Sequence, residues 1–184
     1  MATLLVKNIH TLATFDDAQR EIRHGALWVR DNVIEQVGTT AELPDTADEV
    51  LDLGDRYVVL PGLVNTHHHF FQTLTRVIPS AQDHELFQWL QSLYPLWSNI
   101  TAEILRTSAQ MAAAELMLSG CTTASDHNYL FPNDCTLDDE IEAIQEIGLR
   151  FHANRGSMSI GESQGGLPPD GLVEDEAFIL KDSQ

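Results

Sequence analysis

Residues 61–76 read PGLVNTHHHFFQTLTR. A short apolar segment, LVNT, precedes three consecutive histidines, and a polar stretch follows them. No step in building a fold requires three imidazoles in a row, so the triplet calls for a chemical explanation. The rest of the sequence predicts which fold surrounds the triplet and therefore what the histidines can do.

The chain changes character at Pro61. Residues 1–60 contain short β-branched and apolar runs, two of them joined by the turn pair Asp31-Asn32. After Pro61, strand-like and helix-like segments alternate. Strands are expected at residues 63–66, 121–129 and 150–158, and helices at residues 101–120 and 136–148. Such alternation predicts an α/β protein with a parallel sheet.

Capping residues mark both helices. Thr101 and Thr136 are suited to the N-cap positions, and Gly120 and Gly148 are suited to ending the helices. A further apolar stripe runs through residues 85–97, where Pro95 is expected to disturb the helix.

Three β/α units do not distinguish a doubly wound sheet from a (β/α)₈ barrel. A barrel takes about 250 residues, more than the part of the chain that follows Pro61 provides. The final segment, FILKDSQ, is apolar-periodic and lacks a C-cap signal. We therefore expect a fragment of a longer protein.

The composition excludes some partners. The chain has 28 Asp and Glu against 10 Lys and Arg, a formal charge of −18. Such a chain repels phosphate backbones, so nucleic acid is not an expected partner. No apolar run approaches the ~20 residues that span a bilayer, and the N-terminus is not expected to be a signal peptide. Two isolated cysteines, Cys121 and Cys135, favour reduced thiols and a cytoplasmic location.

The triplet has a geometry suited to metal binding. At the end of a strand, residues i and i+2 point the same way, so His67 and His69 are expected to converge while His68 points away. Two neutral imidazoles at one point are natural zinc ligands, and sites of parallel α/β folds lie at the carboxyl ends of strands. The alternative is an incidental polar run in a loop.

Several segments carry a resemblance to a known family. PGLVNTHHHFFQ resembles the first barrel strand of the amidohydrolase superfamily, which ends in HxH, and GCTTASDHNY resembles the second. Together with LFQWLQSLYPLW and RFHANRGSMSIGESQGGLPPD, these segments are similar to the 8-oxoguanine deaminase group. The resemblance implies a partial (β/α)₈ barrel, about its first three units, at residues 59–184. Half of a small β-sandwich would precede it at residues 1–58.

The resemblance also assigns roles to residues. It implies that His67 and His69 bind zinc, and that Gln72 and Arg155 contact a small heterocyclic substrate. The alternatives are an ordinary surface amide for Gln72 and a structural salt bridge for Arg155. Asp126 and His127 end the second strand and either orient a ligand or form a structural pair.

The resemblance implies that the catalytic proton-transfer groups lie beyond Gln184, so the chain alone is expected to be inactive. The implied activity is hydrolytic deamination of 8-oxoguanine with release of ammonia. From the apolar runs alone, a membrane is not an expected partner. Homo-oligomerisation of the full-length enzyme stays open. The alternatives are a triazine or pterin hydrolase of the same superfamily, or a non-catalytic protein that binds a metal or heterocycle.

Overall fold

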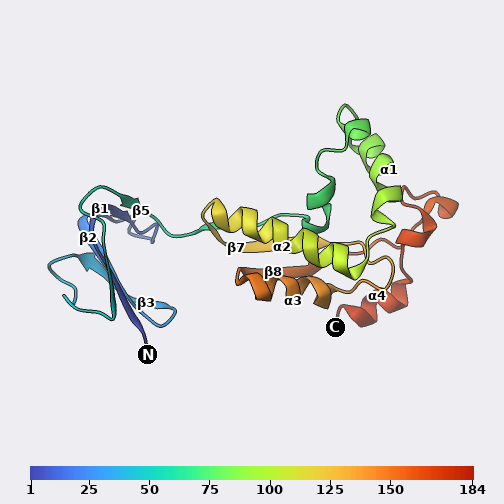
Figure 1. Ribbon diagram of the computed structural model, residues 1–184. Coiled ribbons are helices and arrows are strands. Elements are labelled where there is room, and N and C mark those ends of the chain that lie inside the picture. Colours follow the sequence, from blue (N-terminus) through green and yellow to red (C-terminus); the bar gives the residue numbers. More distant parts are fainter. The chain divides into compact units, whose positions relative to one another are not determined.

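The computed structural model describes residues 1–184, which divide into two compact units, Met1–Pro61 and Gly62–Gln184 (Figure 1). The first unit is a five-stranded sheet in the order β3-β2-β1-β4, with β5 also paired to β1. β1 is antiparallel to β2 and parallel to β4 and β5. The strands are β1 (Thr3–Ala13), β2 (Glu21–Arg30), β3 (Val33–Thr39), β4 (Glu49–Asp52) and β5 (Val58–Val59).

Each face of this sheet carries a small apolar cluster. Leu5 packs with Ala26 and Trp28, whereas its neighbour Val6 packs with Ile9 and other residues. Successive side chains of a strand point to opposite faces, which explains the two clusters. The β2–β3 hairpin turns at Asp31, whose φ of 51° suits the tight turn predicted there.

The second unit contains the histidine triplet. Its sheet is parallel, in the order β6-β7-β8, and helices α2 and α3 run alongside the strands (Figure 1). The predicted alternation of strands and helices is therefore confirmed. The elements are β6 (Leu63–Asn65), α1 (Leu86–Trp97), α2 (Ala102–Leu118), β7 (Cys121–Asn128), α3 (Leu137–Ile147), β8 (Arg150–Arg155) and α4 (Glu176–Asp182). Four short 3₁₀ helices complete the unit, at Phe70–Thr75, Pro79–Ala81, Glu162–Gln164 and Asp170–Leu172.

The predicted caps hold both long helices. The Thr101 side chain accepts a hydrogen bond from the Ile104 backbone N–H at the start of α2. Thr136 forms a capping box with Asp139 at the start of α3, and Gly148 ends that helix at φ 87°. α1 continues through Pro95, which lies in its last turn, so this proline does not end the helix.

Two apolar clusters form the core of the second unit. One lies between α2, α3 and the strands, and contains Phe70, Ala109, Ala113, Ala124 and Ile144. The other surrounds α1, where Leu93 and Trp97 are fully buried. None of the helices combines the length and apolar character needed to cross a membrane.

Candidate metal centre

The three histidines follow β6 and precede the 3₁₀ helix at Phe70–Thr75. The Asn65 side chain accepts a hydrogen bond from the His67 backbone N–H at 3.0 Å, which turns the chain as it leaves the strand. The rings of His67 and His69 then approach edge to face, with centroids 4.9 Å apart. The two histidines singled out by spacing therefore lie together, although they occupy a turn rather than the strand itself.

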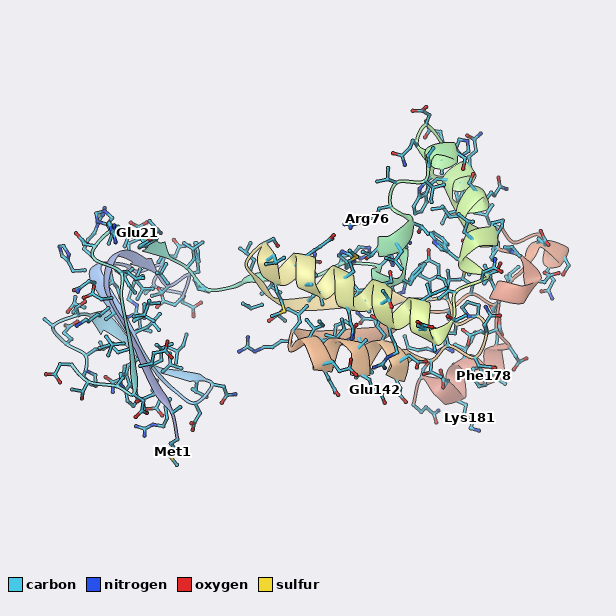
Figure 2. The ribbon with its side chains drawn as sticks, viewed as in Figure 1. Met1, Glu21, Arg76, Glu142, Phe178 and Lys181 are labelled. Carbon is cyan, nitrogen blue, oxygen red and sulfur yellow. The ribbon has the colours of Figure 1, made fainter.

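His68 points elsewhere. Its ring packs against Phe70 at a centroid distance of 4.8 Å, and its Nδ1 atom is buried without a hydrogen-bond partner. Burial lowers the pKa of His68, and the neighbouring His69 and Arg76 lower it further. The Arg76 guanidinium, labelled in Figure 2, makes two 2.7 Å hydrogen bonds with the Glu115 carboxylate.

His69 is fixed in one tautomer. Its Nδ1 atom lies 2.7 Å from the backbone oxygen of His127. A carbonyl oxygen only accepts, so Nδ1 carries the proton and Nε2 keeps a free lone pair. Partial burial lowers the pKa of His69, which favours the neutral ring. Such a bond to one ring nitrogen is how metal-binding histidines are oriented.

These rings fit half of a zinc site. Zinc takes about four ligands in a tetrahedron, commonly imidazole nitrogens. No group of three or more His, Cys, Asp or Glu side chains gathers in the chain to hold a metal. His67 and His69 therefore offer two of the positions that such a site needs.

Asp126 and His127 act on the turn through the backbone. Asp126 Oδ1 accepts a hydrogen bond at 2.5 Å from the backbone N–H of Phe70, the residue that follows His69. The His127 N–H donates to the His68 backbone oxygen at 2.9 Å, in addition to the bond that its own carbonyl receives. Spacing drew attention to both residues, but it did not indicate that main-chain atoms make most of these contacts.

A glycine allows β8 to approach β7 closely beside these residues. A Cβ atom at Gly156 would lie 2.5 Å from His127 Nε2 and 2.8 Å from the Tyr129 Cβ. Only glycine fits such a close approach without moving its neighbours.

Gln72 lies on the same turn as His69. Together with His68, His69, Thr73 and Arg76 it lines a cavity of about 170 Å³. The Gln72 amide lies near the Tyr129 hydroxyl, whose pKa burial raises to about 12. The Tyr129 ring itself is 5.4 Å from that of His69. Gln72 is therefore a polar group beside His69 and near the partly buried Tyr129, a residue that sequence reasoning missed.

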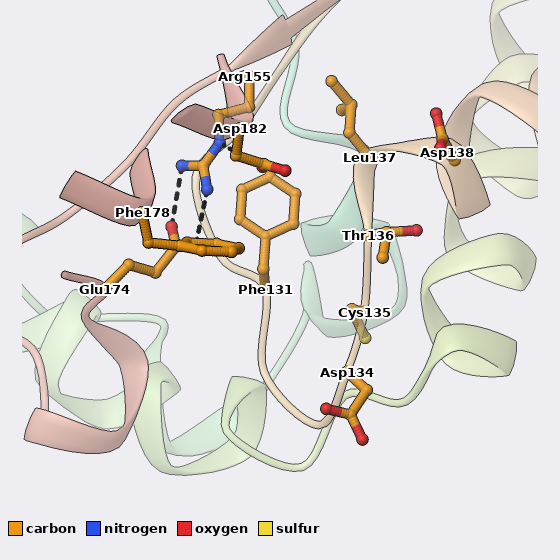
Figure 3. Close-up of a pocket in the computed structure, with 10 residues that line it drawn as sticks. All are labelled: Phe131, Asp134, Cys135, Thr136, Leu137, Asp138, Arg155, Glu174, Phe178 and Asp182. Carbon is orange, nitrogen blue, oxygen red and sulfur yellow. Dashed lines mark hydrogen bonds and ion pairs between the residues drawn. The ribbon is translucent and has the colours of Figure 1, made fainter. Parts of the chain in front are cut away.

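Arg155 lines a different cavity, of about 510 Å³ (Figure 3). Its guanidinium forms two hydrogen bonds with Glu174, of 2.6 and 2.9 Å, and one of 3.0 Å with Asp182. It also lies over the Phe131 ring, 4.7 Å from the centroid, and its bonds to Glu174 raise its pKa. Strand alternation puts Arg155 on the same face as Phe151, which packs toward the helices. Gln72 and Arg155 are thus not brought together.

Comparison with known proteins identifies the class. Residues 58–181, well over half of the chain, match the model described as the amidohydrolase family, so the chain belongs to that family. It is 46% identical over 163 residues to an 8-oxoguanine deaminase of Pseudomonas aeruginosa, a match that covers 87% of this chain and 36% of that protein.

Solved structures agree with this membership. A triazine hydrolase from Arthrobacter aurescens superposes with a TM-score of 0.90 and 29% identity, over 98% of this chain and 41% of its own. An atrazine chlorohydrolase from that species, complexed with zinc, gives a TM-score of 0.88 and 30% identity, over 97% and 41%. The chain thus spans about two fifths of the proteins it matches, and the predicted family and partial-barrel fold are confirmed.

Proposed function

We propose that the whole protein, meaning the complete product of the reading frame that encodes this chain, is a zinc-dependent deaminase. Its reaction is the hydrolysis of an exocyclic amine of an oxidised purine, 8-oxoguanine, with release of ammonia. The single observation behind this proposal is the facing pair of His67 and His69, with the Nε2 atom of His69 free to bind a metal. Residues 1–58 and 59–184 then belong to a β-sandwich domain and a barrel domain.

The donor set supports zinc. His67 and His69 would hold the ion through imidazole nitrogens, and Asn65 and His127 fix the backbone and ring on which this depends. When bound, zinc lowers the pKa of a water ligand and supplies a nucleophile at neutral pH. The proton-transfer groups are proposed to lie beyond Gln184.

Gln72 is proposed to form hydrogen bonds with the edge of the heterocycle. An amide donates to one ring atom and accepts from another, and Gln72 lies near the Tyr129 hydroxyl. Four bonds to Glu174, Asp182 and the Gly156 backbone oxygen occupy the Arg155 guanidinium, which has five N–H groups. If Arg155 contacts substrate, it does so through the one N–H that remains on Nη2.

The choice of 8-oxoguanine is supported by the 46% identity to the Pseudomonas aeruginosa deaminase. A second candidate is hydrolysis of a triazine, supported by the TM-score of 0.90 to the Arthrobacter aurescens triazine hydrolase. Both candidates use the same histidine pair, so only an assay on several substrates can distinguish the two activities.

The test compares substrates and one variant in the whole protein. Zinc-loaded protein is assayed on 8-oxoguanine, guanine, isoxanthopterin and a hydroxylated triazine. We expect the highest kcat/KM on 8-oxoguanine. Gln72→Ala should keep zinc and lose roughly ten- to a hundredfold in kcat/KM, because a ring atom is left unpaired at ~1–3 kcal/mol. Preference for the triazine, or an unchanged Gln72→Ala variant, would overturn the assignment.

A further inference from the structure

A cluster of polar side chains is buried between β7 and α3. Asp126, Asn128 and Glu140 are 1%, 0% and 0% exposed. Seven buried side-chain atoms in the chain have no hydrogen-bond partner, and four of them belong to these three residues. The four atoms are Asp126 Oδ2, Asn128 Nδ2 and both carboxyl oxygens of Glu140. Such a concentration of unpaired buried atoms needs a physical explanation.

The two carboxyl groups lie beside each other, and the Asn128 amide lies near Glu140 without making a hydrogen bond to it. No lysine or arginine pairs with either carboxyl. The other groups acting on Asp126 are the backbone N–H groups of Phe70 and His127 and the ring of His67. Burial raises the pKa of both carboxyls, and the Asp126 charge raises that of Glu140 further. Two adjacent buried carboxylates without a cation would be costly.

We propose that Glu140 is a neutral carboxylic acid that donates its proton to the Asp126 carboxylate, and that this pair positions the histidine turn. One proton then pairs two of the four unpaired atoms, because the Glu140 hydroxyl donates to Asp126 Oδ2. Asp126 keeps its negative charge, which strengthens its 2.5 Å hydrogen bond to the Phe70 N–H.

The connection to the turn is short. Phe70 directly follows His69, and both of its backbone groups are fixed: Asp126 accepts from its N–H, and Ser108 on α2 donates to its carbonyl at 2.6 Å. Its ring is fully buried and stacks on Phe151 with centroids 5.6 Å apart. Glu140 on α3 therefore acts on the position of His69 through Asp126 and one backbone N–H. The effect on zinc rests on the proposed function, whereas the shared proton does not.

Two variants of the whole protein test the shared proton. Glu140→Gln keeps the shape and an N–H donor toward Asp126, whereas Glu140→Leu keeps similar volume without a donor. We expect a carboxylic-acid band in the infrared difference spectrum between wild type and Glu140→Gln at neutral pH. Amide exchange at Phe70 should be unchanged in Glu140→Gln and at least about tenfold faster in Glu140→Leu. Absence of the band would overturn the proposal. If Glu140→Leu does not fold, the infrared band alone tests the shared proton.

A matched control separates positioning from general stability. Ile144 is fully buried on α3, one turn beyond Glu140, and packs in the apolar cluster. We expect Glu140→Leu to weaken zinc binding about fivefold or more, Glu140→Gln to retain it, and Ile144→Ala to lower the melting temperature without changing zinc affinity. Equal loss of zinc in Ile144→Ala and Glu140→Leu would overturn the positioning role. A wild-type protein that binds no zinc would overturn that role and the proposed function together, while the infrared band still decides the shared proton.

Discussion

The Nδ1 atom of His69 donates a hydrogen bond to the backbone oxygen of His127, 2.7 Å away on the neighbouring strand β7. This bond joins residues 58 positions apart and leaves Nε2 of His69 as the only lone pair on the ring. The nitrogen that His69 would offer to a metal is thus set by a backbone atom of strand β7 rather than by the His127 side chain.

This arrangement predicts unequal roles for the three histidines. In the whole protein, His67→Ala and His69→Ala should each weaken zinc binding at least about tenfold, because each removes an imidazole of the facing pair. His68→Ala should retain most of the metal, because His68 packs on Phe70 instead. Elemental analysis after dialysis measures the metal content, and equal losses in all three variants would contradict the assignment.

Arg155 is predicted to matter for stability. Its side chain is 8% exposed and that of Glu174 is 15% exposed, so Arg155→Ala leaves a largely buried carboxylate unpaired. The expected cost is about 2 kcal/mol, or a fall of about 5 °C in melting temperature. Arg150→Ala is the matched control, because Arg150 is exposed at the other end of β8 and should change the melting temperature little. Calorimetry that finds equal effects for both would refute this role.

The shared proton predicts a pH dependence. Glu140 has its pKa raised from 4.5 to about 9, first by burial and then by the Asp126 charge. A folded-state pKa above the unfolded value means that the unfolded chain releases this proton first. Stability from this group is therefore complete below about pH 4.5 and falls as the pH rises toward 9. The melting temperature of wild type relative to Glu140→Gln should decline across that interval, and a constant difference would count against it.

The two thiols are predicted to be unreactive in the folded chain. Cys121 and Cys135 are free and buried, and burial, with Asp139 and Asp134 adding to it, raises the pKa of Cys135 to about 11. The thiolate is the reactive form, so labelling by a disulfide reagent at pH 8 should be slow in buffer and complete in denaturant. Rapid labelling of Cys135 without denaturant would show that the segment before α3 opens readily.

Much of the second unit could be predicted from local signals. Thr101, Thr136 and Gly148 cap their helices because capping depends on residues within one turn. The pairing of His67 with His69 also follows from local spacing. The alternation of side-chain direction along β8 could also have been used. It predicts that Arg155 lies on the helix-facing side of the sheet, together with Phe151.

The partners of Arg155 and the role of Glu140 were harder to predict. Glu174 and Asp182 lie 19 and 27 residues beyond Arg155, and their approach depends on the path of the loops after β8. Glu140 follows two aspartates at the start of α3, where acidic residues are ordinarily solvated. One signal was present: Glu140 shares the buried face of the helix with Ala143 and Ile144, at helical spacing.

The missing side chain at Gly156 has a consequence for mutagenesis and laboratory evolution. Even a methyl group there would press on the imidazole of His127 and on Tyr129. His127 carries the carbonyl that fixes the His69 ring, and Tyr129 lies near Gln72. A library that randomises Gly156, directly after β8, should therefore contain almost no functional replacement at this position. Variants that retain function should carry compensating changes at positions 127 or 129. Such changes would show how much the turn that carries His67 and His69 can be altered.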